Sequence, residues 1–146
     1  MRKSPWVWFQ GLQLSAMVAV MVKRPVVLVV DDEQIVLEAA ASVIEHANLY
    51  DVIAVTSFDC AAAYLADSGS VDVLITDYRL RAARSGLELC QIAVARNRAV
   101  AIVVISAEPS EDIEPRPRCS VFLRKPFGVT ALLDAIEAAR EKALGA

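Results

Sequence analysis

Short apolar runs alternate with amphipathic stretches along the chain from residue 24 onward. Residues 26–30 are β-branched apart from Leu28, which predicts a buried strand. Val36, Ala40, Val43 and Ala47 then recur at helical spacing and predict a helix with one apolar face. The same alternation occurs five times, with further strands expected at 52–55, 71–76, 99–105 and 120–123.

The later helices show the same one-sided apolar pattern. Their expected buried positions are Phe58, Ala61, Ala62 and Leu65, then Leu87, Cys90 and Val94, and finally Val129, Leu132, Leu133 and Ile136. Strands and helices that alternate with short crossovers imply an α/β fold with a parallel sheet and right-handed crossovers. The apolar content of 56% fits a sheet that helices cover on both faces.

Polar residues that could bind a ligand or react follow four of the five strands. Asp31 and Asp32 follow the first, Asp77 the third, Ser106 the fourth and Lys125 the fifth. Ligands of open α/β sheets bind at the carboxyl ends of the strands. Carboxylates that gather there repel one another, and a Mg²⁺ ion with oxygen ligands relieves that repulsion. The pattern predicts a cation site at this edge.

In the order and spacing of these residues, positions 24–144 resemble the receiver domain of two-component response regulators. The resemblance implies a doubly wound, five-stranded parallel sheet in the order 2-1-3-4-5, as in flavodoxin and CheY. It also implies that Asp77 is the phosphoacceptor. Mg²⁺ would then be held by Asp31, Asp32, Asp77 and the backbone carbonyl of Arg79, with Asp31 acting mainly through water.

The resemblance assigns further roles near the phosphoryl group. Ser106 and Lys125 would bind its oxygens, and Ser106 and Phe122 would form a switch that responds to phosphorylation. The alternative for Phe122 is that it packs in the core in both states. Arg79 and Glu108 flank the path of attacking water in this family, so their pairing would slow hydrolysis of the aspartyl phosphate.

The implied partners are a histidine kinase or phosphotransfer protein and an unknown downstream protein. We expect a cytoplasmic, stand-alone receiver, a monomer or weak dimer, that is no enzyme beyond its own phosphorylation and dephosphorylation. Two alternatives stay open. One is a receiver-like module that binds partners without phosphorylation. The other is a phosphohydrolase with an aspartate nucleophile, for which Asp31 and Glu33 would stand at the Asp-x-Asp positions.

Two connections depart from the family pattern. The loop after Asp77 lacks the common proline, reaches Gly86 one residue late and carries three arginines, which either favour an anionic phosphodonor or are only solvated. The 18 residues between Ser106 and Lys125 contain three prolines. Because proline breaks helices, we expect the fourth helix to be about one turn or absent, and the segment 108–118 to open at low cost.

The net charge, the cysteines and the first 22 residues narrow the possible functions and locations of the protein. A net charge of −3 and a pI near 5.2 argue against a general nucleic-acid binder. The three widely spaced cysteines are expected to be small hydrophobes in a reducing cytosol, and His46 a surface residue. Residues 1–22 are too polar for a membrane span and are expected to be a disordered extension or over-long start, with a membrane-surface anchor as the alternative. The receiver domain would span 23–146.

Overall fold

A computed structural model describes residues 23–67, 70–113, 117 and 119–145 of the chain. Residues 1–22, for which the sequence predicts a disordered extension or an over-long start, therefore lie outside the described residues. Five parallel strands form the main sheet in the order β2-β1-β3-β6-β7, which confirms the predicted order 2-1-3-4-5. These strands are β1 (Val26–Val30), β2 (Asp51–Val55), β3 (Val73–Asp77), β6 (Ala101–Ser106) and β7 (Ser120–Arg124).

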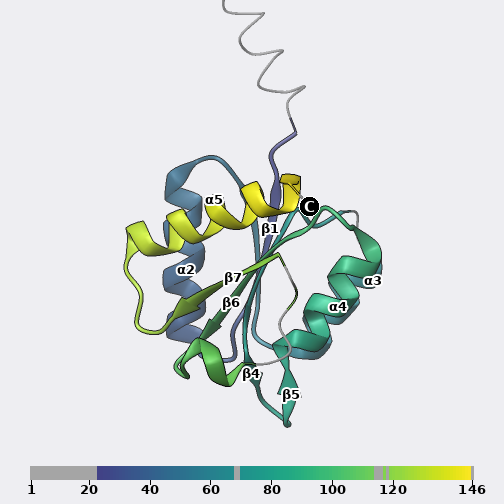
Figure 1. Cartoon of the computed structure of the whole chain (residues 1–146), viewed down its shortest axis with the longest axis vertical. Helices are drawn as coiled ribbons and strands as arrows, with labels where there is room; N and C mark the ends of the chain where they lie inside the picture. Colours follow the sequence, from purple (N-terminus) through teal and green to yellow (C-terminus); the bar gives the residue numbers. More distant parts are fainter. Residues whose placement is uncertain (1–22, 68–69, 114–116, 118, 146) are drawn as a thin grey trace, which may run out of the picture.

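Helices cover both faces of the sheet (Figure 1). Helices α2 (Gln34–Ala47) and α5 (Val129–Gly145) lie on one face, and α3 (Phe58–Asp67) and α4 (Gly86–Arg96) lie on the other. A separate two-stranded hairpin, β4 (Arg79–Leu80) and β5 (Arg84–Ser85), projects from the carboxyl edge of the sheet. No helix of the described residues is long and apolar enough to cross a membrane.

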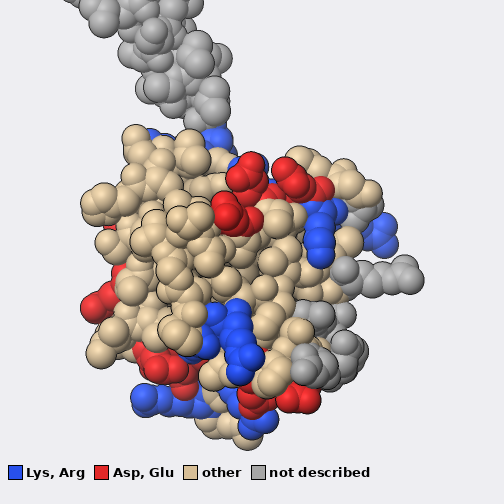
Figure 2. All heavy atoms as spheres, turned by 60° about the vertical axis from the view of Figure 1, so that its left-hand side comes forward, with Lys and Arg blue, Asp and Glu red and all other residues tan. Residues whose placement is uncertain are grey.

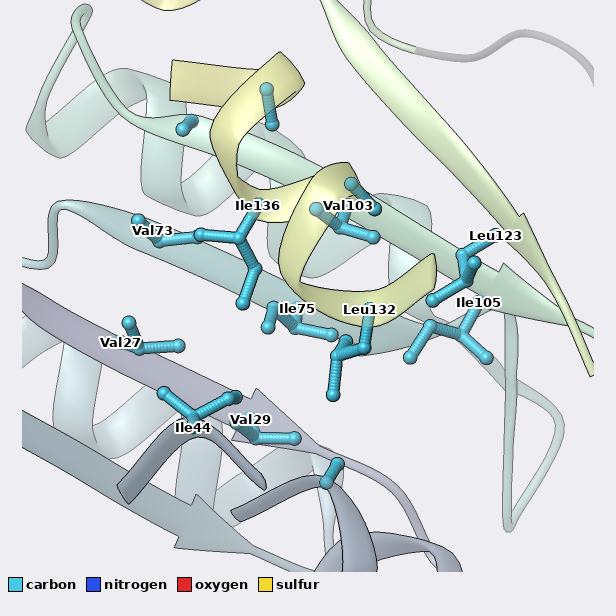
Figure 3. Close-up of a cluster of buried hydrophobic side chains, with 14 of the residues drawn as sticks. Val27, Val29, Ile44, Val73, Ile75, Val103, Ile105, Leu123, Leu132 and Ile136 are labelled. Carbon is cyan, nitrogen blue, oxygen red and sulfur yellow. The ribbon is translucent and has the colours of Figure 1, made fainter. Parts of the chain in front are cut away.

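Side chains of each central strand alternate between two cores. Val27 and Val29 of β1 belong to the core under α2 and α5, whereas Leu28 and Val30 belong to the core under α3 and α4. In Figure 3, Leu132 and Ile136 of α5 lie against side chains of β3 and β6, and Ile44 of α2 lies beside β1. Full burial of one such side chain contributes roughly 1.5–3 kcal/mol to folding.

The buried faces of the helices differ in detail from the prediction. On α2 the buried residues are Leu37, Ala40 and Ile44, so the centre of the stripe is one position away from Val36 and Val43. On α4, Leu89 and Ala93 are buried while Val94 is 38% exposed. Val129 at the start of α5 is also exposed, at 58%. The predicted stripes on α3 and the middle of α5 are largely confirmed, by the buried residues Phe58, Ala61, Leu65, Leu132 and Ile136.

Serine side chains cap two helices. The Ser57 hydroxyl accepts a hydrogen bond from Cys60 N at 3.1 Å at the start of α3, and Ser85 accepts one from Leu87 N at 3.1 Å at the start of α4. Helix α2 ends at Asn48, whose φ of 58° lies in the left-handed region that Asn tolerates. These local signals fix where the helices begin and end.

The connection between β6 and β7 contains no full helix in its described part. Only one turn of 3-10 helix, Ser110–Asp112, stands where the family has its fourth helix, as its prolines predicted. Ile113 directly after this turn is fully buried in the core under α3 and α4. Among the described residues of this connection, Ile113 is thus the apolar side chain that is buried in the core.

Candidate functional site

Asp77 is the last residue of β3, at the carboxyl edge of the sheet. Its strand lies between β1 and β6, with Val30 paired to Thr76 and Asp77 paired to Ile105. This register brings the residues that follow β1 and β6 to the same edge. Asp77 is only 7% exposed, although it is a carboxylate. A buried acid at a strand end needs partners to compensate for its lost hydration.

Lys125 supplies one such partner from the residue after β7. Its Nζ lies 3.0 Å from Asp77 Oδ2, 3.0 Å from Asp31 Oδ2 and 3.1 Å from Glu33 Oε1. The backbone holds this position, because Lys125 N donates to the carbonyl of Ser106 at 2.9 Å. One ammonium group therefore meets three carboxylates from two other strand ends.

Burial and neighbouring charges shift the pKa values of this group. Burial raises the pKa of the Asp77 carboxyl above its ordinary value, and the nearby Asp31 charge raises it further. Contacts with Lys125 and with the backbone N–H of Arg79 act in the opposite direction without cancelling that rise. For Lys125, burial lowers the pKa, but the contacts with Asp31, Asp77 and Glu33 outweigh it and leave the pKa above its ordinary value. Lys125 is thus held as a cation.

Three carboxylates of this edge also fit a metal ion. One oxygen each from Asp31, Glu33 and Asp77 lie within 4.8 Å of one another. Asp31 Oδ1 accepts a hydrogen bond from Glu33 N at 2.9 Å. Asp31 Oδ2 is fully buried and has no hydrogen-bond partner among the described residues, so its contact with Lys125 is one of charge alone. A divalent cation would give this buried carboxylate oxygen the partner that no hydrogen bond supplies.

Arginines close the outer side of the site. Asp32 Oδ2 lies 3.5 Å from Nε of Arg81, and Nε of Arg79 pairs with Oε1 of Glu108. Arg79 and Glu108 also line a cavity of about 290 Å³ together with Asp77 and Lys125. Asp32, Glu33, Ser106 and Ala107 complete its wall. Figure 2 shows charged residues of both signs gathered at the lower end of the molecule, where the strands end.

The remaining predicted residues lie near this cavity or behind it. Ser106 is buried, and its hydroxyl accepts a hydrogen bond from Glu108 N at 3.0 Å. Phe122 lies on β7 beside Val104 and packs partly buried against the core under α3 and α4. The structure thus brings Asp31, Asp32, Asp77, Ser106 and Lys125 to one edge. Their roles, and those of Phe122 and of the Arg79 carbonyl, stay predictions.

The hairpin after Asp77 returns the chain to the end of β3. Gly86 N donates to the carbonyl of Tyr78 at 2.8 Å, and a Cβ on Gly86 would overlap the carbonyl oxygen of Asp77 and lie 2.6 Å from Thr76 Oγ1. Only glycine permits this approach. The late glycine noted in the sequence therefore has a geometric role, since it lets α4 begin directly against the end of β3.

Comparison with known proteins identifies the family. The sequence pattern of the response regulator receiver domain matches residues 27–137, so the chain belongs to this family of two-component signalling domains. No curated protein matches the chain. A response regulator receiver protein from Sinorhizobium medicae is similar, with 26% identity and a TM-score of 0.75 over 83% of this chain and 98% of that one.

Two further solved structures share the fold. The chemotaxis response regulator CheY4 of Vibrio cholerae has 21% identity and a TM-score of 0.69, over 80% of this chain and 99% of that one. A CheY-like receiver domain protein from Methanospirillum hungatei has 17% identity and a TM-score of 0.69, over 85% of this chain and all of that one. Receiver domains are generally signalling modules that interact with kinases or phosphotransfer partners, and the family binds Mg²⁺ at an acidic pocket.

The contact between Glu33 and Lys125 could not be predicted from the sequence pattern alone. Its backbone is extended, with φ of −88° and ψ of 107°. Side chains two residues apart in extended chain point to the same side. Asp31 and Glu33 accordingly face Lys125, whereas Asp32 meets Arg81. Three consecutive acids in extended chain point to alternate sides, and this rule could have predicted that Asp31 and Glu33 share a side and Asp32 faces away from it.

Proposed function

We propose that Asp77 accepts a phosphoryl group from a histidine kinase or phosphotransfer protein, in a reaction that requires Mg²⁺. The observation that supports this most strongly is the buried Asp77 carboxylate, 3.0 Å from the Lys125 ammonium and near an Asp31 oxygen that has no hydrogen-bond partner in the described part of the chain. Asp31, Asp32 and Asp77, with the backbone carbonyl of Arg79, would hold the ion. When bound, Mg²⁺ would neutralise charge on the phosphoryl oxygens.

The residues of the chain have distinct parts in this reaction. An oxygen of Asp77 attacks the phosphorus of phosphohistidine, and the bond from phosphorus to the histidine nitrogen breaks. Lys125 is already placed beside Asp77 and contacts the incoming phosphoryl oxygens. The Ser106 hydroxyl lines the same cavity and donates a hydrogen bond to a phosphoryl oxygen once it leaves Glu108 N. The result is an aspartyl phosphate that signals through contacts with a downstream protein.

Intact-mass analysis after treatment with acetyl phosphate tests this proposal. We expect a gain of one phosphoryl group that requires Mg²⁺ and is lost in Asp77→Asn. No gain under any condition would favour a module that binds partners without phosphorylation. Steady release of phosphate from many unrelated monoesters would instead favour a phosphohydrolase.

A further inference from the structure

Glu33 differs from the other two carboxylates that contact Lys125 in how much water reaches it. The side chain of Glu33 is 62% exposed, whereas those of Asp31 and Asp77 are 3% and 10% exposed. All three oxygens nevertheless lie 3.0–3.1 Å from the same ammonium nitrogen. An ammonium group has three N–H donors and no acceptor. Nζ donates hydrogen bonds to Glu33 Oε1 and Asp77 Oδ2, and its third contact, with Asp31 Oδ2, is an ion pair at 3.0 Å. Three anionic oxygens therefore already surround the ammonium nitrogen.

A phosphoryl group on Asp77 brings new anionic oxygens to this ammonium, so one resting contact has to be given up. Asp31 Oδ2 is a poor candidate, because it is buried, has no hydrogen-bond partner among the described residues and would lose its ion pair with Lys125 as well. Asp77 is the residue that carries the phosphoryl group. Glu33 can be rehydrated at little cost, since most of its side chain already meets solvent.

We propose that Glu33 is a positioning residue that holds Lys125 in the unphosphorylated state and releases it to the phosphoryl group. This inference rests on the proposed phosphorylation of Asp77 and adds to it a residue that opposes the modified state. Competition for one ammonium means that the Glu33 contact lowers the affinity of the site for a phosphoryl group. By linkage, loss of that contact raises the affinity by the same factor.

The geometry allows the side chain to be changed without loss of the fold. Glu33 precedes α2, and its side chain makes no capping hydrogen bond. Its structural contacts come from the backbone, where Glu33 N donates to Asp31 Oδ1 at 2.9 Å and Glu33 O accepts from Leu37 N at 3.0 Å. Alanine keeps both. Aspartate keeps the charge as well, but it is one methylene shorter and can turn to cap the helix.

The test uses beryllofluoride, an anion that occupies a carboxylate oxygen in place of a phosphoryl group, titrated into the full chain at saturating Mg²⁺ and followed by NMR. We expect Glu33→Ala and Glu33→Asp each to bind about two- to fivefold more tightly than the wild type, the range that an exposed ion pair allows. Glu38→Ala is the matched control, because Glu38 is an exposed acid on α2 that contacts Gln34 and should leave the affinity unchanged.

The outcomes separate this inference from the proposed function. If Glu33→Ala binds more tightly but Glu33→Asp matches the wild type, charge repulsion alone acts and the competition for Lys125 is refuted. Equal affinity in all variants also refutes the role of Glu33 and leaves the phosphoacceptor intact. If the wild type binds no beryllofluoride, both the phosphoacceptor and the role of Glu33 are wrong.

Discussion

The two connections that flank the site, residues 78–85 after β3 and residues 107–119 after β6, are built in opposite ways. The first is a hairpin whose ends are tied to the sheet, because Tyr78 N donates to Ile105 O at 2.8 Å and Gly86 N donates to Tyr78 O at 2.8 Å. Its Arg84 also lies over the ring of Phe58 on α3, at 3.8 Å from the centroid. The second has one turn of 3-10 helix and the buried Ile113 in its described part.

The comparison separates two requirements of a receiver. The chemistry proposed for Asp77 needs a fixed arrangement of carboxylates and Lys125, and the connection after β3 supports that arrangement through backbone contacts. A response to phosphorylation needs a segment with low local stability. We expect the connection after β6 to have that property, because its described part forms only one turn of 3-10 helix.

The largest effect is expected from Gly86→Ala in the hairpin connection. The added Cβ meets the backbone of Asp77, which no side-chain rotation can relieve. Overpacking typically costs 1–3 kcal/mol and more where nothing can move, so we expect a loss of about 3 kcal/mol in the free energy of unfolding by urea denaturation. Gly128→Ala is the control, since a Cβ there meets nothing within 4 Å. Equal stability of the two variants would mean that the approach of α4 to β3 is not tight.

In the other connection, Ile113→Ala should cost about 2–4 kcal/mol in the same measurement, the usual range for such a deletion in a core. Ile35→Ala serves as its control, because Ile35 is 84% exposed and should change stability little. A loss below about 0.5 kcal/mol for Ile113→Ala would contradict its role as the anchor of this connection.

The reactivity of the Cys90 thiol reports on how well Ile113 packs in the core. Cys90 lies in the core that contains Ile113 and lines a groove beside Pro117. Burial raises the pKa of the Cys90 thiol to about 12, so at pH 8 it is protonated and slow to alkylate. The exposed Cys60 should react readily. We expect Ile113→Ala to speed the alkylation of Cys90 at least several-fold by peptide mass analysis, while the rate at Cys60 stays constant.

A smaller gain in stability is expected at the tip of the hairpin. Ala82 and Ala83 both have positive φ, 62° and 56°, in a region that costs an alanine roughly 1–2 kcal/mol. Ala83→Gly relieves that strain, offset in part by the entropy of glycine in the unfolded chain, and should stabilise the protein by about 0.5–1 kcal/mol. The same change at Ala131, an exposed position on α5, should instead destabilise by about 1 kcal/mol.

The smallest effect concerns the pair that bridges the two connections. Arg79 in the hairpin contacts Glu108 after β6, beside the cavity at Asp77. If this exposed pair hinders water, Arg79→Ala combined with Glu108→Ala should shorten the lifetime of the aspartyl phosphate about two- to fivefold. Decay is followed by intact mass after removal of acetyl phosphate. An unchanged lifetime would remove this role of the pair.

The strands and their ends could be predicted from the sequence because continuous apolar runs stop at a polar residue. Val30 before Asp31 marks the end of β1 in both the sequence and the structure, and β6 continues one residue beyond the predicted end at Ile105, to Ser106. Three prolines also predicted the loss of the fourth helix, through a local steric rule. Such signals need no knowledge of distant contacts.

The buried helix faces and the partner of Lys125 depended on tertiary packing. In a chain that is 56% apolar, Val36 and Leu37 are both plausible core residues, and only the direction from which α2 meets the sheet selects Leu37. Glu33 likewise lies 92 residues from Lys125 along the chain, and the contact depends on how the turn after β1 points. Periodicity can place Asp31 and Glu33 on one side of the chain, but it does not show that Lys125 lies opposite them or from which direction α2 meets the sheet.

Borohydride reduction of the phosphorylated protein tests the central claim most directly. Reduction converts an aspartyl phosphate to homoserine, and peptide sequencing by mass spectrometry then locates the modified residue. We predict homoserine at position 77 after treatment with acetyl phosphate and Mg²⁺, and none without Mg²⁺. Homoserine at position 31 or 32, or a phosphoryl group that survives in Asp77→Asn, would contradict the assignment of Asp77 as the phosphoacceptor.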